Sequence, residues 1–242
     1  MENGIAVFAV VCAFIIKGMS GFANTLVFTT IMSFNASNIN ITPLELLIGY
    51  PSNIYIAWKE RKGISAKVCI PLSLLVVLGI VPGILFLKNG NTGFIKILFG
   101  LAVIFTGLEM LLRERQPGKG KSSKLAFFLI GFLSGVLCGL FGVGAFLVAY
   151  ISRTTDNLAQ FKGNLCIVFF VENTVRIILY SLTGILNPGI LKQAVLLMPF
   201  MVIGLAAGML LSKKSGEKFV KNTVIILLIL SGISLIISNI SI

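Results

Sequence analysis

The sequence "GMSGF", residues 18–22, interrupts an apolar run over residues 4–34 of a 242-residue chain. Glycine loosens a helix, and a serine hydroxyl competes for backbone hydrogen bonds. The arms on either side, 5–16 and 22–34, would each be about 18 Å long as helices, or half of a hydrocarbon core of about 30 Å. If the run lies in a membrane, the break falls at depth, where irregular backbone is tolerated only when helices bury it or when it lines a watery cavity.

The composition indicates a membrane protein. Hydrophobic residues make up 57% of the chain and charged residues only 12%, against about 25% charged residues in soluble domains. The mean hydropathy is +1.02. Further apolar runs are long enough, some of them barely, to cross a bilayer as helices: 43–58, 68–87, 95–112, 165–186, 191–211 and 219–240. We therefore expect an all-α polytopic membrane protein.

A second break, "CGLFGVG" at residues 138–144, interrupts the run 125–151. Each broken run is either a single crossing or a hairpin that returns to the side it left. With two hairpins and the N-terminus outside, the predicted cytoplasmic loops hold 15 Lys and Arg and the outside segments hold 3; with two single crossings the two sides hold 10 and 8. Because cytoplasmic loops are enriched in Lys and Arg, hairpins are favoured, with both termini extracytoplasmic.

The two halves of the chain share a glycine pattern. Glycines recur at an offset of 121 residues and, after a four-residue slip, of 125: Gly18/Gly139, Gly21/Gly142, Gly63/Gly184, Gly79/Gly204 and Gly83/Gly208. Each half is then a hairpin, 4–34 or 125–151, followed by an odd number of crossings, so the halves have opposite orientations. The predicted fold is two inverted repeats, 1–112 and 125–242, each a broken-helix re-entrant hairpin plus three transmembrane helices, joined by a basic cytoplasmic linker over 113–124.

Inverted repeats with discontinuous helices are typical of transporters, whose sites lie near the midplane between the halves. At each tip a helix begins, and its unpaired N–H groups and positive dipole end favour an anion. Ser20, Asn24 and Thr25 supply neutral donors, and the glycines of the second break permit close approach of a ligand. The predicted substrate-binding residues are Ser20, Gly21, Phe22, Ala23, Asn24, Thr25, Asn53, Gly142, Val143, Gly144, Ala145, Asn173 and Arg176. Glycines spaced by four residues are expected to pack helices closely: Gly131, Gly135 and Gly139, Gly79 and Gly83, and Gly204 and Gly208.

Charged residues inside the predicted membrane segments need an explanation. Glu172 and Arg176 have the i, i+4 spacing that allows an ion pair on one helix face. Either the pair is structural, or Arg176 attracts an anion and Glu172 carries a coupling proton. Lys17 is expected either to snorkel to the interface or to face the cavity, and Glu45 and Glu109 are expected to reach the interface. Pro51 is expected to break its helix.

The remaining features narrow the function. The net charge of +12 is interpreted as topology-setting loop charge, not as a nucleic-acid surface. Cys12, Cys69, Cys138 and Cys166 lack metal-ligand spacing and are interpreted as small buried hydrophobes. The first residues, Met-Glu-Asn, lack the basic region of a cleaved signal, so the first apolar run is expected to remain. The expected partners are a small anion and the lipid bilayer, with no nucleic acid, and a homo-oligomer remains open.

Both breaks and the segments after them resemble the TauE/SafE family of membrane permeases, also called sulfite exporters. The resemblance rests on "KGMSGFANTLVFTT", "CGLFGVGAFLVAYI", "QFKGNLCIVFFVENTVRIILYSLTG" and the closing segment from "LLMPFMVIGLAAGMLL" onward, and covers nearly the whole chain. It implies transport of sulfite or small organosulfonates, commonly as export from the bacterial cytoplasm across the inner membrane, without a bound cofactor. Family members often carry a glycine run and a nearby proline after the break, where this chain has 22–24 and 143–145.

Other classes of membrane protein are compatible with parts of this sequence. "GMSG" fits the G-x-S-G pattern of rhomboid intramembrane serine proteases, but the chain has no histidine to activate a serine. Its single aspartate, Asp156, falls in a predicted loop. An enzyme is therefore not expected. An importer of thiosulfate or another small anion, and a membrane subunit that does not itself transport, remain as alternatives.

Overall fold

The computed structural model describes residues 2–32, 38–89 and 124–214, and single positions within 100–111 and 219–237. Over these residues every regular element is a helix. Among the described residues, three helices are long and apolar enough to cross a membrane: Ala66–Phe86, Leu158–Leu182 and Pro188–Lys214. Their outward faces are apolar, as with Ile70, Leu74 and Leu78, each at least 60% exposed. The fold is that of a helical membrane protein.

Both predicted interruptions are present. Helix α1 (Glu2–Ser20) ends before residues 21–23, and α2 (Asn24–Met32) follows. Helix α6 (Lys124–Phe141) ends before residues 142–144, and α7 (Ala145–Thr154) follows. Gly21 and Gly142 have φ angles of 89° and 72°. Only glycine adopts that backbone without strain, so these two positions explain why each helix stops where it does.

The other helices differ in part from the predictions. Helix α3 (Asn38–Lys59) precedes a short 3₁₀ helix η1 (Arg61–Gly63) and α4 (Ala66–Asn89), and α8 (Leu158–Leu182) precedes α9 (Pro188–Lys214). The prediction that Pro51 breaks its helix is wrong, because α3 continues through Pro51. The nearby Gly49 carbonyl accepts a hydrogen bond from the Ser52 hydroxyl at 2.5 Å. Such side-chain bonds are one way in which membrane helices accommodate proline.

Several predictions lie outside the described residues. They concern Glu109, nearly all of the linker 113–124, and most of the runs 95–112 and 219–240.

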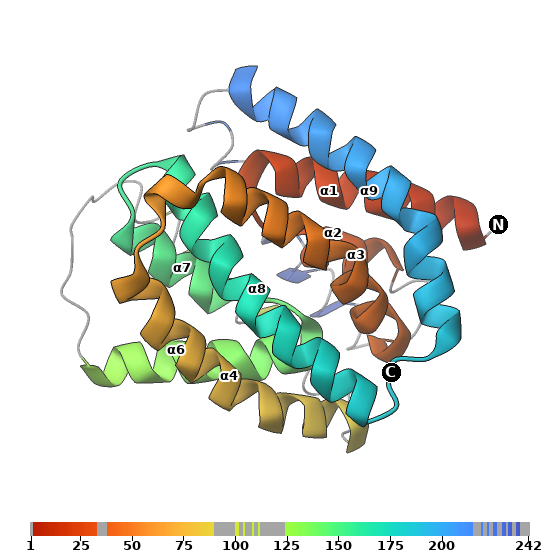
Figure 1. The fold of residues 1–242 in the computed structure, drawn as a ribbon, viewed down its shortest axis with the longest axis horizontal. Coiled ribbons are helices and arrows are strands. Elements are labelled where there is room, and N and C mark those ends of the chain that lie inside the picture. The colour runs from red at the N-terminus through yellow and green to blue at the C-terminus, as the bar shows by residue number, and fades with distance from the viewer. Residues whose placement is uncertain are drawn as a thin grey trace.

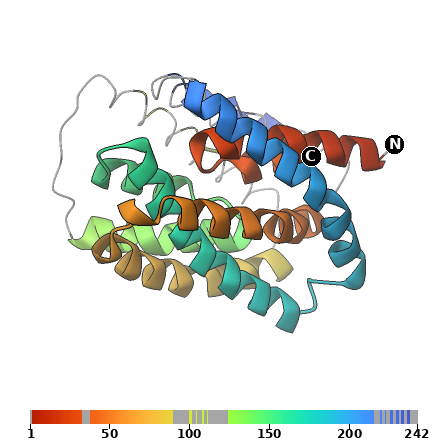
Figure 2. The same cartoon turned by 45° about the horizontal axis from the view of Figure 1, so that its top comes forward.

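The helices pack in an exchanged pattern. Helix α1 lies against α9 at one side of the molecule, α4 lies against α6 at the opposite side, and α3 and α8 cross between them (Figures 1 and 2). Thus the first helix of each half packs on a long helix of the other half. Glycines make these contacts close: a Cβ on Gly18 would lie 2.9 Å from the Gly208 carbonyl carbon, and one on Gly139 would lie 3.0 Å from the Gly83 Cα. Close packing is confirmed for the glycines spaced by four residues in α4, α6 and α9.

Candidate functional site

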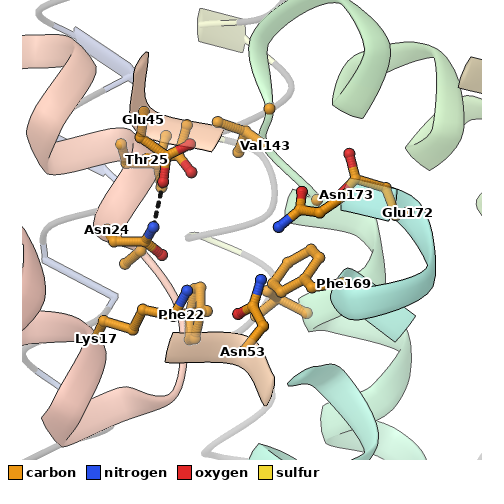
Figure 3. A pocket seen from close by; sticks show the side chains of 15 residues that line it. Lys17, Phe22, Asn24, Thr25, Glu45, Asn53, Val143, Phe169, Glu172 and Asn173 are labelled. Atoms are coloured by element: carbon orange, nitrogen blue, oxygen red, sulfur yellow. Dashed lines mark hydrogen bonds between the residues drawn. The ribbon is translucent and has the colours of Figure 1, made fainter. Parts of the chain in front are cut away.

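The two interruptions meet at one pocket. It encloses about 440 Å³ of space not filled by atoms, including its open mouth. Residues that follow both breaks line it, together with side chains of α1, α3 and α8 (Figure 3). The lining residues are Lys17, Phe22, Ala23, Asn24, Thr25, Leu26, Glu45, Asn53, Gly142, Val143, Gly144, Val148, Phe169, Glu172 and Asn173. Segments about 120 residues apart in the sequence are therefore neighbours in space.

Two helix N-termini border this pocket. The first turns of α2 and α7 close with hydrogen bonds from the Val27 N–H to the Ala23 carbonyl at 3.1 Å and from the Val148 N–H to the Gly144 carbonyl at 3.0 Å. The N–H groups that precede them have no partner within their helices. The tips are close, since a Cβ on Gly142 would lie 3.2 Å from the Thr25 Cγ2 atom. Unpaired N–H groups and two positive dipole ends make this a favourable position for an anion.

Lys17 lies in the pocket wall. Its side chain is 1% exposed and lines the pocket, so of the two alternatives it faces the cavity and does not snorkel to the interface. Its ammonium makes no hydrogen bond or ion pair with any residue that the structure describes, and its recorded contact is with the Phe14 ring, 5.7 Å from the ring centroid. The break begins at Gly21, four residues after Lys17, so Lys17 lies in the last turn of α1, next to the pocket.

Glu45 is a charged residue whose predicted position is wrong. It was expected at the interface, but it is 4% exposed and lines the pocket. Its carboxylate accepts a hydrogen bond from the Asn24 side-chain amide, and the Thr25 hydroxyl lies beside it (Figure 3). Gly49 leaves room for this carboxylate, since a Cβ on Gly49 would lie 3.0 Å from the Glu45 Oε1 atom. The carboxylate thus lies at the N-terminus of α2.

The wall at the second break is apolar and narrow. A Cβ on Gly144 would lie 2.7 Å from the Phe169 ring.

Two amide side chains, Asn53 of α3 and Asn173 of α8, are 2% and 7% exposed and also line the pocket. The Asn53 Oδ1 atom is buried without a hydrogen-bond partner in the described part of the chain. Rotation of the amide by 180° would present its NH₂ group instead, so this side chain is available to a ligand.

The predicted pair of Glu172 and Arg176 is formed. Arg176 Nη1 donates to Glu172 Oε1 at 3.0 Å, and both side chains are at most 2% exposed. Arg176 Nη2 donates to the Tyr180 hydroxyl at 3.2 Å, which donates to the Gly139 carbonyl at 3.3 Å. Arg176 is not among the lining residues, so it lies behind the wall and supports the carbonyl end of α6.

Lys162 has the corresponding role at the first break. Its ammonium donates to the Gly18 carbonyl at 3.2 Å and to the Ser212 hydroxyl at 3.1 Å. A cation near a helix C-terminus stabilises the unpaired carbonyls there. The predicted run 165–186 begins after Lys162, so the sequence did not place this residue at the break. The missed signal is the N-cap, in which Asn157 Oδ1 accepts from the Gln160 N–H at 2.9 Å and α8 begins at Leu158.

The structure brings most of the predicted substrate-binding residues to the pocket, and their contact with a substrate stays a prediction. Ser20 is not among the lining residues. Its Oγ lies 2.8 Å from both the Ile16 and Phe22 carbonyl oxygens and accepts from the Phe22 N–H, so it stabilises the break itself. Gly21 faces Lys162, and Ala145 is the first residue of α7.

Comparisons with known proteins agree with one another. The model of the family described as "Sulfite exporter TauE/SafE" matches residues 6–235. A curated relative from Cupriavidus necator, described as a probable sulfite/organosulfonate exporter TauE, is 27% identical over 139 residues, 54% of this chain and 54% of the relative. The aligned part of this chain thus spans about half the length of that relative. No solved structure matches.

Proposed function

The chain belongs to the sulfite exporter TauE/SafE family, and we propose that it carries a small sulfur-containing anion, sulfite or an organosulfonate, across the cell membrane by secondary active export. The family is one of transporters, not of enzymes. The observation that carries the proposal is the pocket where two interrupted helices meet inside an apolar, all-helical chain. A polar, partly open cavity at such a place has no role in packing, because unpaired polar groups away from water destabilise a fold.

The chemistry of the pocket supports an oxyanion. The N–H groups at the starts of α2 and α7 donate to it, and Lys17 supplies the full positive charge. Asn53 and Asn173 donate from the α3 and α8 walls. Gly144 lets a sulfonyl group approach the α7 backbone. Arg176 is bonded to Glu172 and Tyr180, so we assign it to positioning α6 and not to substrate contact.

The exchanged packing supports a transport cycle between inverted repeats. Because α1 packs on α9 and α6 packs on α4, a rotation of one half relative to the other would move each hairpin with a helix of the opposite half. Such a movement would open the pocket first to one side of the membrane and then to the other. Loop charges favour both termini on the extracytoplasmic side of the membrane.

A flux experiment tests this function. Purified protein in liposomes is loaded with sulfite, thiosulfate, methanesulfonate or acetate, and efflux and uptake are followed with and without a pH gradient. We expect sulfite and methanesulfonate to exchange faster than acetate, and protein-free liposomes to show neither. Faster uptake of thiosulfate than of sulfite would favour an importer. Absence of flux for every sulfur anion, by protein that remains folded in the liposomes, would exclude the proposal.

A further inference from the structure

The Glu45 carboxylate lies at the N-terminus of α2, one of the two helix N-termini that would bind an anion. It is held at the N-terminus of α2 by the Asn24 amide, with Thr25 beside it, and its side chain lines the pocket. An oxyanion bound to the α2 N–H groups would need the same donors. A bound anion and an ionised Glu45 would also repel each other in an environment that screens charge weakly. Glu45 and the substrate are therefore alternative occupants of one position.

The charges around Glu45 leave it no dedicated partner. From α1 it faces Lys17, and from α8 it faces Arg176 and Glu172. Arg176 is already bonded to Glu172 and Tyr180. No ion pair to Glu45 occurs among residues 2–32, 38–89 and 124–214. Near Lys17, the other titratable neighbours are the Cys166 thiol and the Glu172 carboxyl group, both of α8. Lys17 is thus shared between Glu45 in the empty site and an anion in the loaded site.

We propose that Glu45 is an internal competitor of the transported anion and that it carries the coupling proton, an inference that rests on the proposed function. In the empty protein the carboxylate accepts from Asn24 and balances Lys17. A hydronium ion in the open pocket transfers its proton to one carboxylate oxygen and leaves as water, which frees the donors of α2 for the anion. When the anion leaves on the other side, the O–H bond breaks and the same proton is released there with it.

This mechanism sets the coupling. The empty site with ionised Glu45 and the site loaded with a monoanion and protonated Glu45 carry the same net charge. Both forms can therefore reorient, and a form with anion but no proton is disfavoured. Anion and proton move in the same direction, about one proton for each anion. Net transport follows the sum of the substrate and proton gradients, so a combined outward gradient drives export and a combined inward gradient drives uptake.

Glu45→Gln in the full chain tests the proposal, since glutamine copies the protonated side chain in shape and charge. Methanesulfonate is the main probe because it stays ionised over the pH range used, and sulfite is the second. Wild type should bind methanesulfonate more tightly as the pH falls, by at most about tenfold per pH unit. Glu45→Gln should bind with an affinity independent of pH, keep anion exchange, and lose the proton movement that a pH dye reports inside the liposomes.

A matched control and a second measurement complete the test. Glu172→Gln should keep the pH dependence of binding, and loss of that dependence in Glu172→Gln but not in Glu45→Gln would overturn the assignment. If Glu45→Gln does not fold, proton uptake by wild type on addition of methanesulfonate in weakly buffered detergent solution decides, and no uptake overturns the inference. Anion flux without any proton coupling in wild type would overturn the inference and leave the proposed function intact. Absence of all sulfur-anion flux would overturn both.

Discussion

The two interruptions have similar backbone geometry but are lined by different side chains. In each, a helix ends at a glycine with positive φ, Gly21 or Gly142, and a new helix begins after two further residues. Around the first break the wall is polar and charged, whereas around the second it is small or apolar. At the offset of 121 residues, the residues Lys17, Asn24 and Glu45 of the first half correspond to Cys138, Ala145 and Cys166 of the second.

This difference indicates a division of labour between similar halves. The repeated backbone brings two helix N-termini to one cavity, and either half contributes equally to that geometry. Charge compensation and proton binding, in our proposals, come from the first half alone. The second half contributes close approach through Gly144. Both breaks are nevertheless held by cations of one helix, α8, with Lys162 at Gly18 and Arg176 at Gly139 through Tyr180.

The largest expected effect is at the anchor of the second break. Arg176→Met would leave Glu172 buried without its partner and Tyr180 without its donor. Removal of one partner of a buried ion pair destabilises a protein by about 3–5 kcal/mol. Lys162→Met, at the anchor of the first break, removes the cation that donates to the Gly18 carbonyl and the Ser212 hydroxyl, and we expect a loss of about 1–3 kcal/mol. Thermal unfolding in detergent measures both.

The control for this pair is Arg176→Met combined with Glu172→Gln, which removes the uncompensated charge and should recover part of the stability. If Lys162→Met proved as destabilising as Arg176→Met, the two anchors would be equivalent, and the contrast between the breaks would not extend to their supports.

The next effect concerns the charge at the first break. Lys17→Met should weaken sulfite binding by about 10- to 150-fold, because hydrogen bonds to a charged group contribute about 1.5–3 kcal/mol. Cys138→Ala, the change at the corresponding position of the second half, should alter the affinity little, since Cys138 is fully buried and does not line the pocket. The concentration of sulfite that gives half-maximal flux measures both. Equal losses in the two variants would show that the charge asymmetry plays no part in binding.

The sequence predicted the breaks but not the depth of the charges. Two glycines beside a serine in an apolar run identified the first interruption, and the glycines of "CGLFGVG" identified the second. The position of Glu45 was missed, and that of Lys17 was left open, because hydropathy along a run gives neither the face of a helix on which a side chain lies nor how the helix tilts. Asn24 and Thr25 were chosen as donors without their neighbour Glu45, since contacts between α2 and α3 depend on packing that no local pattern encodes.

A smaller effect tests whether the backbone of the breaks is required. Gly142→Ala should destabilise the protein by about 1–2 kcal/mol, because its φ of 72° is unfavourable for a residue with a Cβ atom. The added methyl would also lie 3.1 Å from both Arg176 Nη atoms. Gly4→Ala is the matched control. Its Cβ would meet nothing within 4 Å, so alanine should stabilise α1 by about 0.5–1 kcal/mol. A neutral Gly142→Ala would mean that the break tolerates another backbone conformation.

The smallest expected effect is at Ala23, where the first break departs from the second. Ala23 has a φ of 69°, whereas Gly144, the residue 121 positions later, has a φ of −100°. Ala23→Gly would relieve about 1–2 kcal/mol of strain. It would also remove a buried methyl, at about 0.8 kcal/mol, and increase the freedom of the unfolded chain by about 0.5–1 kcal/mol. These contributions nearly cancel, so the unfolding temperature should change little. A clear gain would mean that the methyl packs poorly and the strain is kept for binding, whereas a clear loss would mean that packing alone selects alanine there.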